Sequence, residues 1–172
     1  MTIFHRLRAL TGSHDPKVRA ANLIALVLAW NTPFYPLYVY FAAGPAGLRW
    51  TLLNLVAFPL FAAVPFITKQ HPLAGRVLLV IAGTLNTMLN IWLYGEAAGE
   101  QLFLLPCVTI AILLFHRNER AVMAGLLLLP AAAYLMLGHY GVPPFPRGAH
   151  LLGLNAASVG VLTAFLAWTF AE

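Results

Sequence analysis

Two of the five acidic residues in this chain lie in one short stretch, "WLYGEAAGEQLF". Glu96 and Glu100 are flanked by Gly95 and Gly99 and lie between two apolar runs. A carboxylate accepts hydrogen bonds, binds metal ions and changes charge with pH. Because only 9% of the residues are charged, few partners are available to these two side chains.

Two histidines are candidate partners on the same side. His139 follows one apolar run and His150 begins the next, so a helical hairpin would bring both out at a similar depth. Imidazole and carboxylate ligands suit divalent transition metals. We therefore predict a candidate metal site of Glu96, Glu100, His139 and His150, with zinc or copper as the cofactor. A solvated rim, with Glu100 favouring a helix start through the helix dipole, and a pH-responsive His–Glu pair are the alternatives.

Amide side chains inside the apolar runs form a second candidate set. An amide in hydrocarbon needs a hydrogen-bond partner, and Asn86 and Asn90, four residues apart, share one helical face. Interhelical hydrogen bonds, worth about 0.6 kcal/mol each, and a ligand pocket both explain them. The candidate ligand-binding residues are Asn31, Asn54, Asn86, Asn90 and Asn155.

Several kinds of chemistry are not expected. The histidines avoid the middle of the apolar runs, and His71 and His116 lie beside basic loops, so a haem is not expected. No nucleophile–base pair or phosphate loop is present, so the chain itself is not expected to be an enzyme. The single cysteine, Cys107, excludes a disulfide framework.

The elements that must position these residues are membrane helices. The chain is 61% hydrophobic with mean hydropathy +0.82, whereas soluble domains carry about 25% charged residues. About 20 apolar residues cross a bilayer as a helix, which predicts an all-α, multi-pass protein. We expect an amphipathic interfacial segment at 1–20 and a six-helix bundle over 21–170, with spans at 21–43, 50–68, 74–94, 101–116, 120–138 and 150–170.

The basic residues predict the orientation. Lys and Arg concentrate on the cytoplasmic side of bacterial inner-membrane proteins. With both termini in the cytoplasm, only Arg49 and Arg147 face outward. The other basic residues face inward: Arg6, Arg8, Lys17, Arg19, Lys69, Arg76, Arg117 and Arg120. Topology and lipid headgroups therefore explain the net charge of +5, and a nucleic-acid partner is not expected.

Prolines and small residues mark possible irregularities and contacts. A proline within a helix removes a backbone donor, so the prolines either vary the packing or shape a cavity. Gly153, Ala157, Gly160 and Ala164 form a small-residue stripe in the last run, which suits either close packing inside the bundle or a homodimer face. The prolines inside the predicted spans are Pro33, Pro36, Pro59, Pro65, Pro106 and Pro130.

The stretch "GTLNTMLNIWLYGEAAGEQLFLLPC" resembles a known family. It is similar to the six-helix membrane anchor of bacterial class III adenylate cyclases and related receptor kinases. The shared features are the Gly-acid-x-x-Gly turn of Gly95, Glu96 and Gly99, then an apolar stretch and Pro106. The resemblance implies a sensory input domain that binds a small lipophilic or ionic signal on the periplasmic side and relays it through its last helix.

The resemblance also implies partners. It implies a C-terminal cytoplasmic catalytic domain, which the 172 residues do not contain, and a homodimer. An alternative of another class is a small transporter or a structural membrane subunit without signalling output.

Overall fold

The computed structural model describes residues 12–45, 51–139 and 149–171, which form helices, turns and bends without a strand. Short 3₁₀ segments, labelled η, interrupt or precede the α-helices. In chain order the elements are α2 (Pro16–Asn31), η1 (Thr32–Phe34), α3 (Tyr35–Ala43), η3 (Leu52–Val56), α5 (Ala57–Gln70), α6 (Pro72–Tyr94), η4 (Glu96–Ala98), η5 (Glu100–Phe103), α7 (Leu104–Leu113), η6 (Arg117–Glu119), α8 (Arg120–Leu135) and α9 (Ala149–Ala171).

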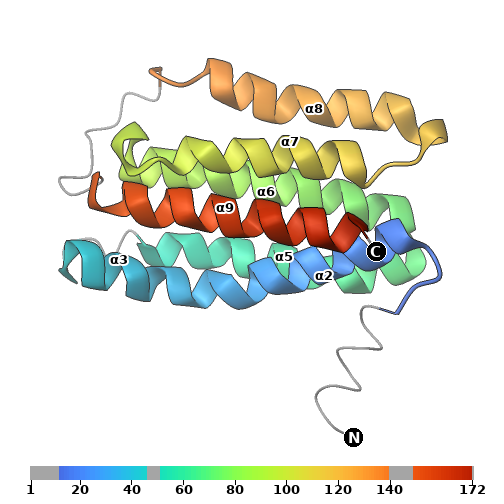
Figure 1. Ribbon diagram of the computed structural model, residues 1–172, viewed down its shortest axis with the longest axis horizontal. Helices are drawn as coiled ribbons and strands as arrows, with labels where there is room; N and C mark the ends of the chain where they lie inside the picture. Colours follow the sequence, from blue (N-terminus) through green and yellow to red (C-terminus); the bar gives the residue numbers. More distant parts are fainter. Residues whose placement is uncertain (1–11, 46–50, 140–148, 172) are drawn as a thin grey trace, which may run out of the picture.

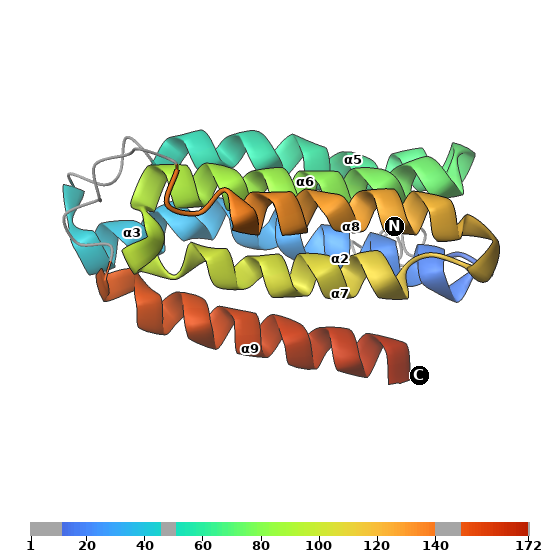
Figure 2. The ribbon, with the colours of Figure 1, turned by 90° about the horizontal axis from the view of Figure 1, so that it is seen from above.

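The long helices lie side by side along a common direction (Figure 1). α5 packs against both α2 and α6, and α7 lies next to α8. α9 runs along one edge of the bundle (Figure 2). Buried apolar side chains of α2, α5, α6 and α7 form the main core, including Ile24, Phe61, Leu79 and Ile110. The expectation of an all-α protein is therefore confirmed for the described residues.

Four helical stretches of the described chain are long and apolar enough to cross a membrane. They are Pro16–Ala42, Leu52–Gln70, Pro72–Tyr94 and Ala149–Ala171. The helices Glu100–Leu113 and Arg117–Leu135 pass the same criterion only together, and they are bent by 115° at the break between them. The six helical stretches match the predicted positions closely, but the crossing of the membrane by all six stays a prediction.

The helix ends follow local chemistry. Asp15 caps α2 by accepting a hydrogen bond from the backbone N–H of Lys17, and Pro16 begins the helix. α6 ends at Gly95, which has a positive φ of 74° and so suits glycine. α2 thus begins before the predicted residue 21. The predicted interfacial segment falls mainly on residues 1–11, which lie outside the described residues.

A polar network fastens the end of the bundle where α2 begins. The guanidinium of Arg76 makes two hydrogen bonds of 2.8 Å to the Glu119 carboxylate and one of 2.7 Å to the Leu114 carbonyl. The ring of His116 lies 3.0 Å from the Asp15 carboxylate. The network therefore joins the starts of α2, α6 and α8 to the end of α7.

The pKa of Asp15 follows from these contacts. Partial burial raises this pKa, but the hydrogen bonds from His116 and the Lys17 backbone, with the charges of His116 and Arg76, lower it more. The pKa of Asp15 therefore lies below its ordinary value of 3.8. The folded state accordingly favours the carboxylate form.

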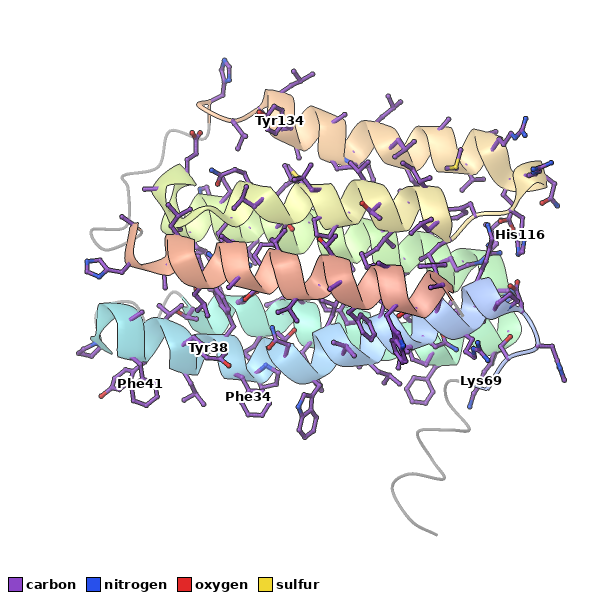
Figure 3. All side chains as sticks on the ribbon, in the orientation of Figure 1. Phe34, Tyr38, Phe41, Lys69, His116 and Tyr134 are labelled. Carbon is purple, nitrogen blue, oxygen red and sulfur yellow. The ribbon has the colours of Figure 1, made fainter. Side chains whose placement is uncertain are left out.

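The surface of the bundle is largely apolar. Phe34, Tyr38 and Phe41 point outward from η1 and α3 (Figure 3). The residues of the small-residue stripe on α9 are exposed, and a Cβ atom added at Gly153 or Gly160 would meet nothing within 4 Å. The stripe therefore does not serve close packing inside this chain. Lipid or a second copy is left to cover it.

Candidate functional site

The carboxyl group of Glu100 lies inside the bundle. Glu100 begins η5 and is only 1% exposed. The Tyr35 hydroxyl and the Asn155 amide both donate hydrogen bonds to its Oε1, the latter at 2.9 Å. The Asn90 amide lies close enough to interact with the same carboxyl group. Side chains of α3, α6 and α9 thus meet at one carboxyl group.

Two features bring Glu100 to this position. Gly99 precedes it with φ +77°, a conformation that glycine adopts without strain. A Cβ atom at Gly99 would lie 2.5 Å from Leu152 Cδ1, so glycine also permits α9 to approach. The Asn155 amide donates a second 2.9 Å hydrogen bond to the Ala98 carbonyl. The turn between α6 and α7 is therefore fixed to α9 on both sides of Gly99.

A cavity of about 90 Å³ adjoins this cluster. Its wall contains Glu100 and Tyr35 together with Asn31, Asn54, Asn86 and Asn90, while Leu28, Phe61, Leu79, Val80, Phe103, Pro106, Ile110 and Leu162 contribute apolar surface. The structure thus places four of the predicted ligand-binding asparagines on one cavity. The fifth, Asn155, reaches it through its bond to Glu100.

Three amide oxygens on the wall of this cavity have no hydrogen-bond partner within the part of the chain that the structure describes. Among the described residues, Asn54, Asn86 and Asn90 each have a buried Oδ1 atom without a hydrogen-bond partner. The hydroxyls of Thr32 and Thr87, in contrast, donate to carbonyl oxygens one turn earlier in the chain. The threonine hydroxyls therefore form hydrogen bonds within their own segments. The three amide oxygens, in contrast, form no hydrogen bond to another of the described helices.

The broken segments of the chain converge here. η1, η3 and η5 contribute Thr32, Asn54 and Glu100 to the cavity wall. Pro33 and Pro36 lack the N–H groups that a continuous α-helix would use, which accounts for the break between α2 and α3. The structure therefore favours a role for Pro33, Pro36 and the cavity-lining Pro106 in shaping a cavity.

The predicted metal ligands do not gather. The described residues contain no group of three or more His, Cys, Asp and Glu side chains that could hold a metal ion. Glu100 is buried, while Glu96 is exposed and accepts a 2.5 Å hydrogen bond from the Gly138 backbone N–H. His139 and His150 are both exposed. The predicted four ligands do not meet because Glu100 is buried against Asn155, whereas the two histidines are exposed, so we do not propose a metal centre.

Tyr35 is one principal contributor that the sequence pattern did not single out. Its hydroxyl bonds Glu100, and its ring packs against Tyr94 with centroids 5.9 Å apart. A tyrosine in an apolar run usually indicates a side chain at the membrane–water interface. Its position in "TPFYP", between two helix-breaking prolines, was the available signal.

This arrangement has the chemistry of a small-ligand site. The carboxyl group and the amides supply directed hydrogen bonds, and the apolar part of the wall excludes water. Asn155 belongs to α9, the last helix. A change in the hydrogen bonds of Glu100 would therefore also change the contact between Glu100 and α9.

Comparison with known proteins identifies one family. The model of the MASE7 family of membrane-associated sensor domains matches residues 4–170. No curated protein and no solved structure matches the chain.

Proposed function

Because this chain belongs to the MASE7 family of membrane-associated sensor domains, we propose that it is the sensory input domain of a membrane-bound signalling enzyme. The signal binds in the cavity beside Glu100. The single observation that carries this proposal is the burial of Glu100 between a polar cavity and Asn155 of α9. A carboxyl group with a purely structural role would be surrounded by groups that are already hydrogen-bonded, not by amide oxygens without partners.

The last helix carries the signal. α9 packs against η4 and η5 near its beginning and contacts α7, α3 and α2. A ligand shifts a conformational equilibrium only by its difference in affinity for the two states. Binding that changes the hydrogen bonds of Glu100 favours one placement of α9 over another, and α9 leads toward the C-terminus.

The output is a cytoplasmic catalytic domain that follows α9, and the resemblance to class III cyclase anchors favours an adenylate cyclase. The exposed stripe of Gly153, Ala157, Gly160 and Ala164 supports pairing of two copies through α9. The domain resides in the bacterial inner membrane, with both termini in the cytoplasm according to the basic residues. The cavity then opens among the periplasmic halves of the helices.

A chimera tests this function. The chain is fused ahead of a class III cyclase catalytic domain and cyclic AMP is measured in cells. We expect Glu100→Gln to change basal output several-fold, because it replaces the carboxyl group that accepts hydrogen bonds from Tyr35 and from Asn155 of α9. The matched control Glu96→Gln, an exposed glutamate in the same turn, leaves output unchanged. Equal output from both variants, at equal membrane levels, contradicts the proposal.

A further inference from the structure

The chemistry of the cavity defines the class of its ligand, provided that the proposed sensory function holds. The unpartnered buried atoms of Asn54, Asn86 and Asn90 are all Oδ1 oxygens, and oxygens of this kind only accept hydrogen bonds. Asn54 and Asn90 are 3% and 6% exposed, so bulk water does not serve them. A ligand that satisfies them must donate hydrogen bonds.

The charges near the cavity favour a ligand that is a cation as well as a hydrogen-bond donor. The ion pairs of the described residues are Arg76–Glu119 and His116–Asp15, and neither involves Glu100. A buried carboxylate without a counter-charge is costly, so a carboxyl group in this position either keeps its proton or is paired with a cation. Its partners Tyr35 and Asn155 are neutral donors, which stabilise the carboxylate but do not neutralise it. A cationic ligand would supply the missing charge.

The rest of the wall selects an organic cation. Leu28, Phe61, Leu79, Phe103 and Leu162 give the cavity an apolar side on which a bare inorganic ion makes no favourable contact. An engineered cavity of ~150 Å³ holds benzene, so the smaller volume here, about 90 Å³, limits the apolar part to a short chain.

We propose that the cavity binds a small primary amine in its ammonium form, with the ammonium group on Glu100 and the unpartnered amide oxygens of Asn54, Asn86 and Asn90. An ammonium group carries three donors and no acceptor. Its three donors equal in number the three amide oxygens that the structure leaves without partners, while its positive charge is paired with the Glu100 carboxylate. The short alkyl chain lies against the apolar wall.

Direct binding to the purified full chain in lipid nanodiscs tests this proposal by calorimetry. The probe is n-butylammonium chloride at neutral pH, where alkyl ammonium groups are charged because they titrate near ~10. Three comparison ligands separate the contributions. n-Butanol keeps the chain without the charge, tetramethylammonium keeps the charge without N–H donors, and sodium chloride supplies an inorganic cation.

The expected result is saturable binding of n-butylammonium, with each comparison ligand at least about 10-fold weaker. Glu100→Gln weakens butylammonium binding at least about 10-fold, and Glu96→Gln binds as the unmodified chain does. Asn54→Leu removes an Oδ1 atom that has no partner among the residues described, so it should weaken binding, and its helical circular dichroism and melting temperature check that the variant folds. If Glu100→Gln does not fold, Asn54→Leu still tests the proposal.

Several results overturn the proposal. These are equal binding of butanol or tetramethylammonium, full competition by sodium, unchanged binding in Glu100→Gln and Asn54→Leu, or no binding of butylammonium. The chimera separates this failure from failure of the sensory function. If Glu100→Gln alters cyclic AMP output while butylammonium does not bind, the sensor stands and the amine is excluded.

Discussion

At the scale of the residue, one amide connects the turn of Glu100 to the last helix. Asn155 is fully buried and its Nδ2 donates to both the Ala98 carbonyl and Glu100. Buried donors and acceptors that lose their partners cost free energy. The position therefore matters both for stability and for the placement of α9.

Replacement of Asn155 by leucine should destabilise the fold by about 1–3 kcal/mol, because it leaves the Ala98 carbonyl and the Glu100 carboxyl group without this donor. Denaturation of the detergent-solubilised chain, followed by circular dichroism, measures the free energy of unfolding. Thr163→Val is the control, since the Thr163 hydroxyl bonds only the Val159 carbonyl of its own helix. Equal stability of the two variants would refute this role of Asn155.

Asp15 predicts a pH dependence at the opposite end of the bundle. Its folded-state pKa lies below 3.8, so its contribution to stability is present above about 3.8, the unfolded value, and is lost as the pH falls through the lower folded value. Asp15→Asn should therefore melt at a lower temperature than the unmodified chain at pH 6. The difference should shrink as the pH falls below 3.8. A constant difference across this range would contradict the assignment.

At the scale of the element, the glycine turn between α6 and α7 sets the distance to α9. Gly99 and Gly138 both have positive φ, +77° and +81°. A Cβ atom at Gly99 meets Leu152, whereas one at Gly138 meets nothing within 4 Å. The two glycines therefore share the same backbone demand but differ in their surroundings.

Alanine at either glycine should cost about 1–2 kcal/mol of backbone strain, and Gly99→Ala should cost more because the Leu152 side chain of α9 must also shift. The melting temperatures of the two variants measure the difference. Gly138→Ala serves as the matched control for strain alone. A Gly99→Ala chain as stable as Gly138→Ala would show that α9 does not pack closely on this turn.

The sequence predicted the helices better than it predicted the contacts between them. The asparagine spacing and the positions of the apolar runs predicted the helices and four residues of the cavity wall, because amides in hydrocarbon must face polar neighbours. The orientation of Glu100 could not be predicted. A glutamate after a glycine is equally typical of a solvated turn. Glu100 lies inside the bundle because it bonds Asn155, a residue far away in the sequence. Tyr35 was missed for the same reason, since its partner lies on another helix.

At the scale of the whole molecule, the orientation in the membrane is directly testable. The single cysteine, Cys107, is buried, so Cys107→Ala gives a background for single-cysteine variants. A membrane-impermeant maleimide applied to intact spheroplasts should label Glu96→Cys and His139→Cys, but should label Lys69→Cys and Arg117→Cys only after the membrane is opened. These positions are exposed in the bundle. The reverse pattern would contradict the cytoplasmic placement of the termini.

If the cluster around Glu100 controls α9, a change at Glu100 must alter the position of the end of this helix. Spin labels on Lys69→Cys and Trp168→Cys, both exposed, report the distance between the end of α5 and the end of α9 in the Cys107→Ala background. Labelled protein is diluted with unlabelled protein so that only distances within one chain contribute. Double electron–electron resonance should show a shifted or broadened distance distribution after Glu100→Gln and an unchanged one after Glu96→Gln. Identical distributions for the unmodified chain and Glu100→Gln would show that the cavity does not govern the last helix.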